Sequence, residues 1–318
     1  MKKTVQIAAI TATAAFLAAC GTNGEETNNG TGNNGETNNS AETNNAAETE
    51  ETDNESTDNN TADENNGNEA SEDFETLTVG ASNVPHAEIL EYSESLLEEE
   101  GVELEIVTFN DYILPNQSLD EGELDANYFQ HVPYLESQME EFDYDFVNKG
   151  GIHIEPIGLY SQEYDSLDAL PEGAEIIMSS SVADHGRILM MLEEEGLITL
   201  EEEAGINATI DDIAENPNDF NFQDNVEAAL LPTAYENNEG DAVLINSNYA
   251  LDAGLNPLED AIAMESADGD NPYVNVIAAN SEDEGDERLD ILVDVLRSED
   301  VRGFIEENYE GAVVPVEE

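Results

Sequence analysis

The stretch from Thr76 to Phe109, TLTVGASNVPHAEILEYSESLLEEEGVELEIVTF, decides the fold class of the chain. Residues 76–79 form a short apolar pattern that is typical of a strand, and Pro85 stands where helices often begin. Residues 87–100 have the composition of a helix, and residues 104–109 indicate a second strand. A strand, a helix and a strand in succession predict an α/β protein.

The same alternation continues to the end of the chain. From Phe74 onward about 245 residues remain, which is enough for two α/β lobes. Strands that alternate with helices favour a mostly parallel sheet with both faces covered. The further elements that we expect are strands at 124–129, 153–159, 175–178, 242–245 and 273–279, and helices at 134–141, 186–197, 288–296 and 300–309.

The first twenty residues predict export and attachment to lipid. Two lysines precede an Ala-rich apolar run at 7–19, which is shorter than the roughly 20 residues that span a membrane. The run ends in Leu17-Ala18-Ala19-Cys20, which resembles a bacterial lipobox and contains the single cysteine of the chain. We therefore expect residues 1–19 to be a signal peptide and Cys20 to be lipidated. The alternative is an ordinary signal peptide followed by an incidental cysteine.

The segment after Cys20 predicts a tether. Residues 21–72 consist mainly of Asn, Glu, Thr, Gly and Ser, with almost no large apolar side chain. Such a segment buries too little surface to offset the entropy that ordering costs. We expect residues 20–73 to be a lipidated, disordered acidic linker that leads to the folded part.

The charge balance of the chain is strongly acidic. It has 76 acidic and 7 basic residues, with a formal net charge of -69. This excludes nucleic acid as a partner, because affinity there comes from neutralising phosphates, and it disfavours binding to anionic lipid by charge. Such a surface suggests a saline or otherwise extreme external medium, in which ions screen the repulsion between like charges.

We expect the melting temperature of the protein to rise with NaCl concentration, because screening weakens the repulsion among the carboxylates. Thermal melts across a NaCl series measure this. A melting temperature that stays flat or falls with salt would argue against a saline habitat.

No pattern for catalysis or for a cofactor stands out. The chain has no Walker-type loop, no repeat period and no metal-ligand spacing among its four histidines. The folded part has no cysteine nucleophile, no Ser-His-Asp arrangement is apparent, and paired acids are uninformative in so acidic a chain. We therefore expect a protein that is not an enzyme and holds no cofactor or metal, with an enzyme of two-lobed architecture as the competing hypothesis.

Short motifs in residues 77–315 resemble, in order, the methionine-binding lipoproteins of the NlpA/MetQ type, which are substrate-binding proteins of ABC transporters. Each motif is weak alone, but the ordered set is specific. The motifs are Val79-Gly80-Ala81 through Pro85-His86-Ala87-Glu88, Thr108 to Tyr112 with Leu114-Pro115-Asn116, Leu124 to His131 with Pro133-Tyr134, Gly186-Arg187, Ile245 to Ala250, and Pro272 to Asn275.

The resemblance implies a two-lobed periplasmic-binding-protein fold of the two-crossover type, which closes on its ligand by a hinge. Residues 74–157 and 273–318 would form lobe 1, and residues 158–272 would form lobe 2. It also implies that methionine binds between the lobes, and that the partner is an ABC importer with its permease and ATPase. The protein would be anchored by lipid on the extracellular face of the cell membrane.

Three polar residues match the family positions that hold the backbone groups of the ligand. Arg187 matches the arginine that pairs with the ligand carboxylate, for which a guanidinium offers two parallel hydrogen bonds. Asn246 and Asn275 match asparagines whose amides both donate and accept; Asn248 is a weaker match. The alternative for Arg187 is a surface position at the start of a helix, and the alternative for the asparagines is a structural role in turns or helix caps.

Three rings match the family positions that surround the ligand side chain. They are Tyr112, Phe129 and His131, and aromatic rings contact a thioether favourably, by roughly 0.3–1.5 kcal/mol per contact. Aromatics at strand ends are also common in cores, and His131 is alternatively a structural helix cap.

One stretch departs from the family pattern. Family members show Asn-Asp-Pro-x-Asn shortly before Gly-Arg, whereas this chain has Ser180 to Arg187 without a proline and with Asp184 in place of the last asparagine. Asp184 either pairs with Arg187 or receives the ammonium group of the ligand, and we favour the second role. The ligand therefore stays open between methionine, D-methionine, a methionine-containing dipeptide and another small amino acid. A surface interaction protein that has lost transport is the further alternative.

Overall fold

The computed structural model describes residues 75–267 and 271–316. The expected signal peptide, Cys20 and the expected tether lie outside these residues. Among the described helices, none is long and apolar enough to cross a membrane. The described chain forms two large sheets and one small one.

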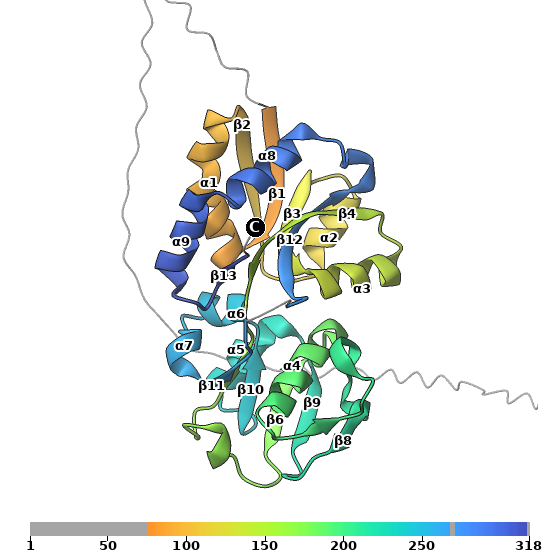
Figure 1. The fold of residues 1–318 in the computed structure, drawn as a ribbon, viewed down its shortest axis with the longest axis vertical. Helices are drawn as coiled ribbons and strands as arrows, with labels where there is room; N and C mark the ends of the chain where they lie inside the picture. Colours follow the sequence, from red (N-terminus) through yellow and green to blue (C-terminus); the bar gives the residue numbers. More distant parts are fainter. Residues whose placement is uncertain (1–74, 268–270, 317–318) are drawn as a thin grey trace, which may run out of the picture. The chain divides into compact units, whose positions relative to one another are not determined.

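The first large sheet has six strands in the order β13-β4-β12-β3-β1-β2. β1 pairs in parallel with β2 and β3, whereas β12 runs antiparallel to β3 and β4. Helices α1, α8 and α9 cover one face, and α2 and α3 cover the other (Figure 1). The bounds are β1 Glu75–Ser82, β2 Val102–Phe109, β3 Ala126–His131, β4 Phe146–Ile154, β12 Val274–Asn280, β13 Val314–Pro315, α1 Glu88–Glu99, α2 Leu114–Asp120, α3 Val132–Phe142, α8 Glu287–Leu296 and α9 Glu299–Tyr309.

The second large sheet has five strands in the order β11-β5-β10-β6-β9. β10, β6 and β9 are parallel, and β5 runs antiparallel to both β10 and β11. The bounds are β5 Gly158–Tyr160, β6 Glu175–Ser179, β9 Asn221–Val226, β10 Ala242–Ile245, β11 Ala261–Met264, α4 Val182–Glu194, α5 Leu231–Glu236, α6 Ser247–Asp252 and α7 Pro257–Asp260. A small pair, β7 (Thr199–Leu200) and β8 (Ile213–Glu215), stands beside it.

The core of the first lobe follows from alternation in β1. Leu77, Val79 and Ala81 are fully buried and lie on one face of the strand, because successive strand side chains alternate. They join a core cluster with Ile89 and Leu97 of α1, two turns apart on one side of that helix. Burying each large side chain contributes roughly 1.5–3 kcal/mol, so this strand–helix contact anchors the lobe.

Two expectations about the fold are wrong in detail. The strand expected at 153–159 is two strands: β4 ends at Ile154 and β5 begins at Gly158. Pro156 lies in the gap, and proline has no N–H to donate to a ladder. The expectation of mostly parallel pairing fails in the first sheet, because β12 returns from the second sheet and inserts antiparallel between β3 and β4.

The chain passes between the two sheets twice. It leaves the first sheet after β4 and returns to it at β12, after β11 has completed the second sheet. Most other elements lie within a few residues of their expected places; helix α4, for example, begins at Val182 rather than at residue 186. The expected lobe limits at 157/158 and 272/273 remain a prediction, and they lie in the segments that join the two sheets.

Candidate functional site

A cavity lies between the two lobes, and residues from both of them line it. The space among its side chains, open solvent at the mouth included, is about 380 Å³. The lining residues are Tyr112, Phe129, Gln130, His131, Tyr134, Glu155, Asp184, Arg187, Asn246, Ser247, Asn248 and Asn275. All seven ligand-binding candidates from the sequence are therefore brought together around one space.

The strand ends explain why these residues meet. Phe129 and His131 lie in the last three residues of β3, and Asn275 of β12 pairs with His131. In the second lobe, Asn246 directly follows β10, and helix α4 follows β6 with Asp184 and Arg187 on its buried side. Ligand sites in α/β sheets form in this way, beyond the carboxyl ends of parallel strands.

Arg187 is buried, so the surface-arginine alternative is wrong. Its Nε donates to Glu265 Oε2 at 3.0 Å, and its Nη2 donates to the backbone oxygen of Glu155 at 2.7 Å and also to Glu265. The guanidinium carbon lies 4.6 Å from the centre of the Tyr273 ring. Burial alone would lower the pKa of Arg187, but the Glu265 carboxylate raises it above its usual value. Within the described residues Nη1 makes no hydrogen bond, which leaves that nitrogen for a ligand.

Asp184 contacts His131 and Asn246 rather than Arg187. Its Oδ1 lies 3.1 Å from His131 Nε2, and its Oδ2 accepts from Asn246 Nδ2 at 3.2 Å. Arg187 has Glu265 as its ion-pair partner, and the described residues contain no ion pair between Asp184 and Arg187. Burial would raise the pKa of Asp184, but the hydrogen bonds from His131 and Asn246 and the nearby charge of Arg187 bring it below its usual value. This aspartate is therefore held as a buried carboxylate that connects the two lobes.

His131 caps a helix and also faces the cavity. Its Nδ1 accepts from the backbone N–H of Tyr134 at 3.1 Å, at the start of α3. The other nitrogen meets Asp184 across the cavity. The cap expected as an alternative is thus present together with the position in the cavity wall.

Three rings of the first lobe form the apolar side of the cavity. The ring centres of Tyr112 and Phe129 are 6.0 Å apart, and those of Tyr112 and Tyr134 are 5.8 Å apart. The Tyr112 hydroxyl donates to Asn248 Oδ1 of the second lobe at 2.7 Å. Tyr134 belongs to one of the family motifs, but the sequence did not predict that it lines the cavity.

Asn246 has an unused acceptor. Its Oδ1 is buried and accepts no hydrogen bond within the described residues, while its Nδ2 is taken up by Asp184. Buried polar atoms are almost always paired, so an unpaired acceptor in a cavity wall marks the place of a ligand N–H group.

Two carboxylates of the site were missed from the sequence. Glu155 lines the cavity, and Glu265 holds Arg187. Nothing distinguishes either of them among 76 acidic residues. Pro156 next to Glu155 was the one local signal, because a proline inside an expected strand indicates a break in that strand.

Gly186→Ala is expected to destabilise the protein by about 1–3 kcal/mol through overpacking. A Cβ at Gly186 would lie 1.9 Å from the backbone oxygen of Ile206, so helix α4, which carries Arg187, would have to move. Denaturant unfolding measures the change. The matched control is Gly303→Ala in helix α9, where nothing lies within 4 Å and alanine should stabilise by up to about 1 kcal/mol. Equal effects of the two substitutions would contradict the close packing of α4.

Two α/β lobes with a mixed polar and aromatic cavity between them are the architecture of solute-binding proteins. The model of the family described as NlpA lipoprotein matches residues 77–317. The methionine-binding lipoprotein MetQ of Bacillus subtilis is 47% identical over 253 residues, which cover 79% of this chain and 92% of that protein. The chain therefore belongs to the NlpA lipoprotein family.

Solved structures are similar in fold as well. A lipoprotein of the YaeC family from Enterococcus faecalis has a TM-score of 0.74 and 52% identity, covering 76% of this chain and 100% of its own. A nutrient-binding protein from Burkholderia cenocepacia, solved bound to methionine, has a TM-score of 0.71 and 39% identity, covering 76% of this chain and 100% of its own. The expected periplasmic-binding-protein fold is confirmed.

Proposed function

We propose that this chain is the substrate-binding protein of an ABC importer, and that it takes free methionine into the cavity between its lobes. The observation that carries the proposal is the composition of the cavity wall, which combines a buried guanidinium, two carboxylates and four amides with three aromatic rings. Free methionine needs both kinds of group, because it has two charged groups and a thioether. The named relatives that bind methionine support this choice.

The polar groups suit the two charges of an amino acid. Glu265 already occupies Nε and Nη2 of Arg187, so these two atoms do not form the parallel pair of hydrogen bonds that the sequence predicts with a ligand carboxylate. The ligand carboxylate binds instead at Nη1. Asp184 and the free Oδ1 of Asn246 accept from the ammonium group. Asn275 Oδ1 lies 3.1 Å from His86 Nε2, which leaves its Nδ2 to donate to the ligand.

The aromatic side suits the thioether. Tyr112, Phe129 and Tyr134 surround the space with ring faces and edges, and sulfur contacts with rings contribute roughly 0.3–1.5 kcal/mol each. Norleucine, in which a methylene replaces the sulfur, should bind more weakly by about the same amount.

The rest of the transport role is inferred from the family and from the N-terminal sequence. Cys20, as the lipidated residue, anchors the protein on the extracellular face of the cell membrane, and residues 20–73 give the folded part its reach. Loaded protein then delivers methionine to a permease that is driven by an ATPase. The chain acts as a carrier and not as an enzyme.

A panel of ligands tests the proposal by calorimetry and thermal shift. L-Methionine should bind one per chain and raise the melting temperature, because a ligand selective for the native state stabilises it. D-Methionine, methionine dipeptides, norleucine and leucine are the comparisons. Absence of binding by every methionine compound would sink the proposal, and tighter binding of a dipeptide would redirect it to that ligand class.

A further inference from the structure

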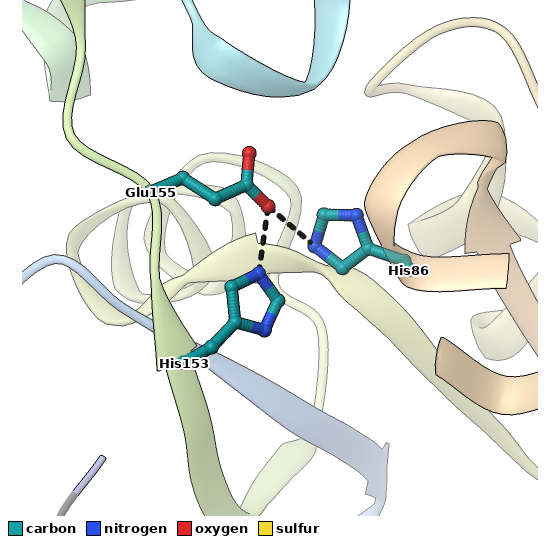
Figure 2. Close-up of side chains that lie close together, drawn as sticks. All are labelled: His86, His153 and Glu155. Carbon is teal, nitrogen blue, oxygen red and sulfur yellow. Dashed lines mark hydrogen bonds and ion pairs between the residues drawn. The ribbon is translucent and has the colours of Figure 1, made fainter. Parts of the chain in front are cut away.

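Two histidines and a glutamate converge beside the cavity (Figure 2). His86 lies in the helical turn Asn83–Ala87, His153 lies near the end of β4, and Glu155 directly follows that strand. Glu155 Oε1 is 2.7 Å from His153 Nε2 and 3.2 Å from His86 Nε2. The three atoms lie within 4.8 Å of one another, so a single ion can reach all of them.

The cluster is buried and ordered by its neighbours. His86 is 1% exposed, His153 is 0% exposed and Glu155 is 6% exposed, so surface flexibility does not explain their approach. The Tyr128 hydroxyl hydrogen-bonds to His153 Nδ1, which fixes that ring. Metal-binding histidines are held in the same way, with the second ring nitrogen bonded to a neighbouring group.

A metal ion binds a neutral imidazole through the ring nitrogen that carries no proton. The Nε2 atoms of both rings face Glu155 Oε1, so the two nitrogens and the carboxylate oxygen converge on one place.

The charge around the cluster favours a cation. Glu155, Asp184 and Glu265 all lie at or beside the cavity, and Arg187 is the one arginine or lysine that lines it. Glu155 is buried, and a buried carboxylate is costly unless it is paired. A bound dication would offset that cost.

We propose that His86, His153 and Glu155 form a binding site for a divalent transition-metal ion of the zinc type. Two imidazole nitrogens and a carboxylate oxygen suit zinc, whose ligand atoms in a tetrahedral site lie about 3.3 Å apart. The two separations from Glu155 Oε1, 2.7 and 3.2 Å, need a widening of a few tenths of an ångström, and all three atoms lie within 4.8 Å of one another. Three protein ligands leave a fourth position open, and Glu155 places the site at the cavity wall.

Metal binding requires a proton shift on each ring. Each imidazole moves its proton from Nε2 to Nδ1. The new N–H of His153 then donates to the Tyr128 hydroxyl, whereas His86 Nδ1 has no partner within the described residues. Without metal, the Nε2–H of His153 donates to Glu155 and that of His86 donates to Asn275 Oδ1, and the cluster is a purely structural network. The site was not expected from the sequence, because His86 and His153 come from distant segments with no ligand spacing.

Zinc titration of the full-length protein tests the site. The protein is stripped with a chelator, dialysed, and titrated by calorimetry with excess Mg²⁺ present, which occupies exposed carboxylates. We expect one zinc per chain and a raised melting temperature. His153→Gln and Glu155→Gln should each weaken zinc binding at least tenfold. His185→Gln is the matched control, because His185 is also buried but bonds to Ser179 O, away from the cluster.

Three results would overturn the site. They are no zinc uptake by the wild-type chain, equal uptake by His153→Gln, and equal loss in the His185→Gln control. Should a variant fail to fold, Co²⁺ added to the wild-type protein gives an independent reading: intense visible absorption supports a four-coordinate site, and weak six-coordinate absorption refutes it. The proposal does not rest on methionine, and methionine titration of the stripped protein reports on the transport function separately.

Discussion

Arg187→Ala is expected to weaken methionine binding at least tenfold, which corresponds to about 1.4 kcal/mol or more. The substitution removes the guanidinium to which we assign the ligand carboxylate, and it leaves Glu265 without its ion-pair partner. Losing one partner of a buried charge pair costs more than losing an exposed one, because the remaining charge is left unpaired. Calorimetry with L-methionine measures the change.

Two further variants separate charge from geometry. Arg187→Lys keeps a positive charge but cannot contact Glu265, Glu155 and a ligand through one planar group, so it should also bind weakly. Arg297→Ala is the matched control, because Arg297 is exposed, donates to Gly151 O and is not among the residues that line the cavity. Unchanged binding by Arg187→Ala would remove this residue from the site.

Asp184→Ala is expected to cost about 1–3 kcal/mol of stability for each buried polar group that it leaves unsatisfied. Asp184 is 1% exposed and bonds to His131 from the other lobe and to Asn246 beside it. Without Asp184, His131 Nε2 and Asn246 Nδ2 would stay buried but would lose the hydrogen bonds that compensate for their removal from water. Urea unfolding measures the loss, and Asp224→Ala, at an exposed position on β9, is the control. Similar stability of the two variants would contradict the structural weight of Asp184.

The pH dependence follows from the direction of the pKa shift. The pKa of Asp184 is lowered in the folded protein, so its ionised form stabilises the fold at neutral pH. That contribution is lost as the pH falls through the folded-state pKa, which lies below the ordinary value of about 3.9 for an aspartate. The wild-type protein should therefore lose more stability in strong acid than Asp184→Ala does.

Asp184→Asn tests the role of the aspartate toward the ligand. The amide keeps a hydrogen-bond acceptor for His131 but loses the charge. If Asp184 receives the ammonium group, methionine binding should fall about tenfold. Unchanged binding would assign the ammonium to Glu155, the other carboxylate of the cavity wall.

Local patterns predicted most elements, because a strand such as β1 and a helix such as α1 are determined by spacing that is visible in a short window. Pairing between distant strands is not visible there. The division of the expected strand has a local signal in Pro156, but the antiparallel insertion of β12 depends on where the chain returns after a whole lobe. Local patterns carry no information about that return.

Site residues that belong to a family motif could be predicted from the sequence, but the carboxylates that contact those residues could not. Arg187, His131 and Asn246 were found in short matches. Glu265 and Glu155 were not, because a carboxylate in so acidic a chain has no distinguishing neighbours. Because acidic residues are so common in the chain, the carboxylates of the site could not be recognised from the sequence, whereas the few basic residues could.

The connection from β4 to β5 has a consequence for release of the cargo. Glu155 lies on this connection, and its backbone oxygen accepts from Arg187 Nη2 at 2.7 Å. Any swing of one lobe about residues 155–157 must displace that oxygen relative to Arg187. If the chain is the carrier that we propose, opening would therefore weaken the contact of Arg187 with a ligand carboxylate in the same movement.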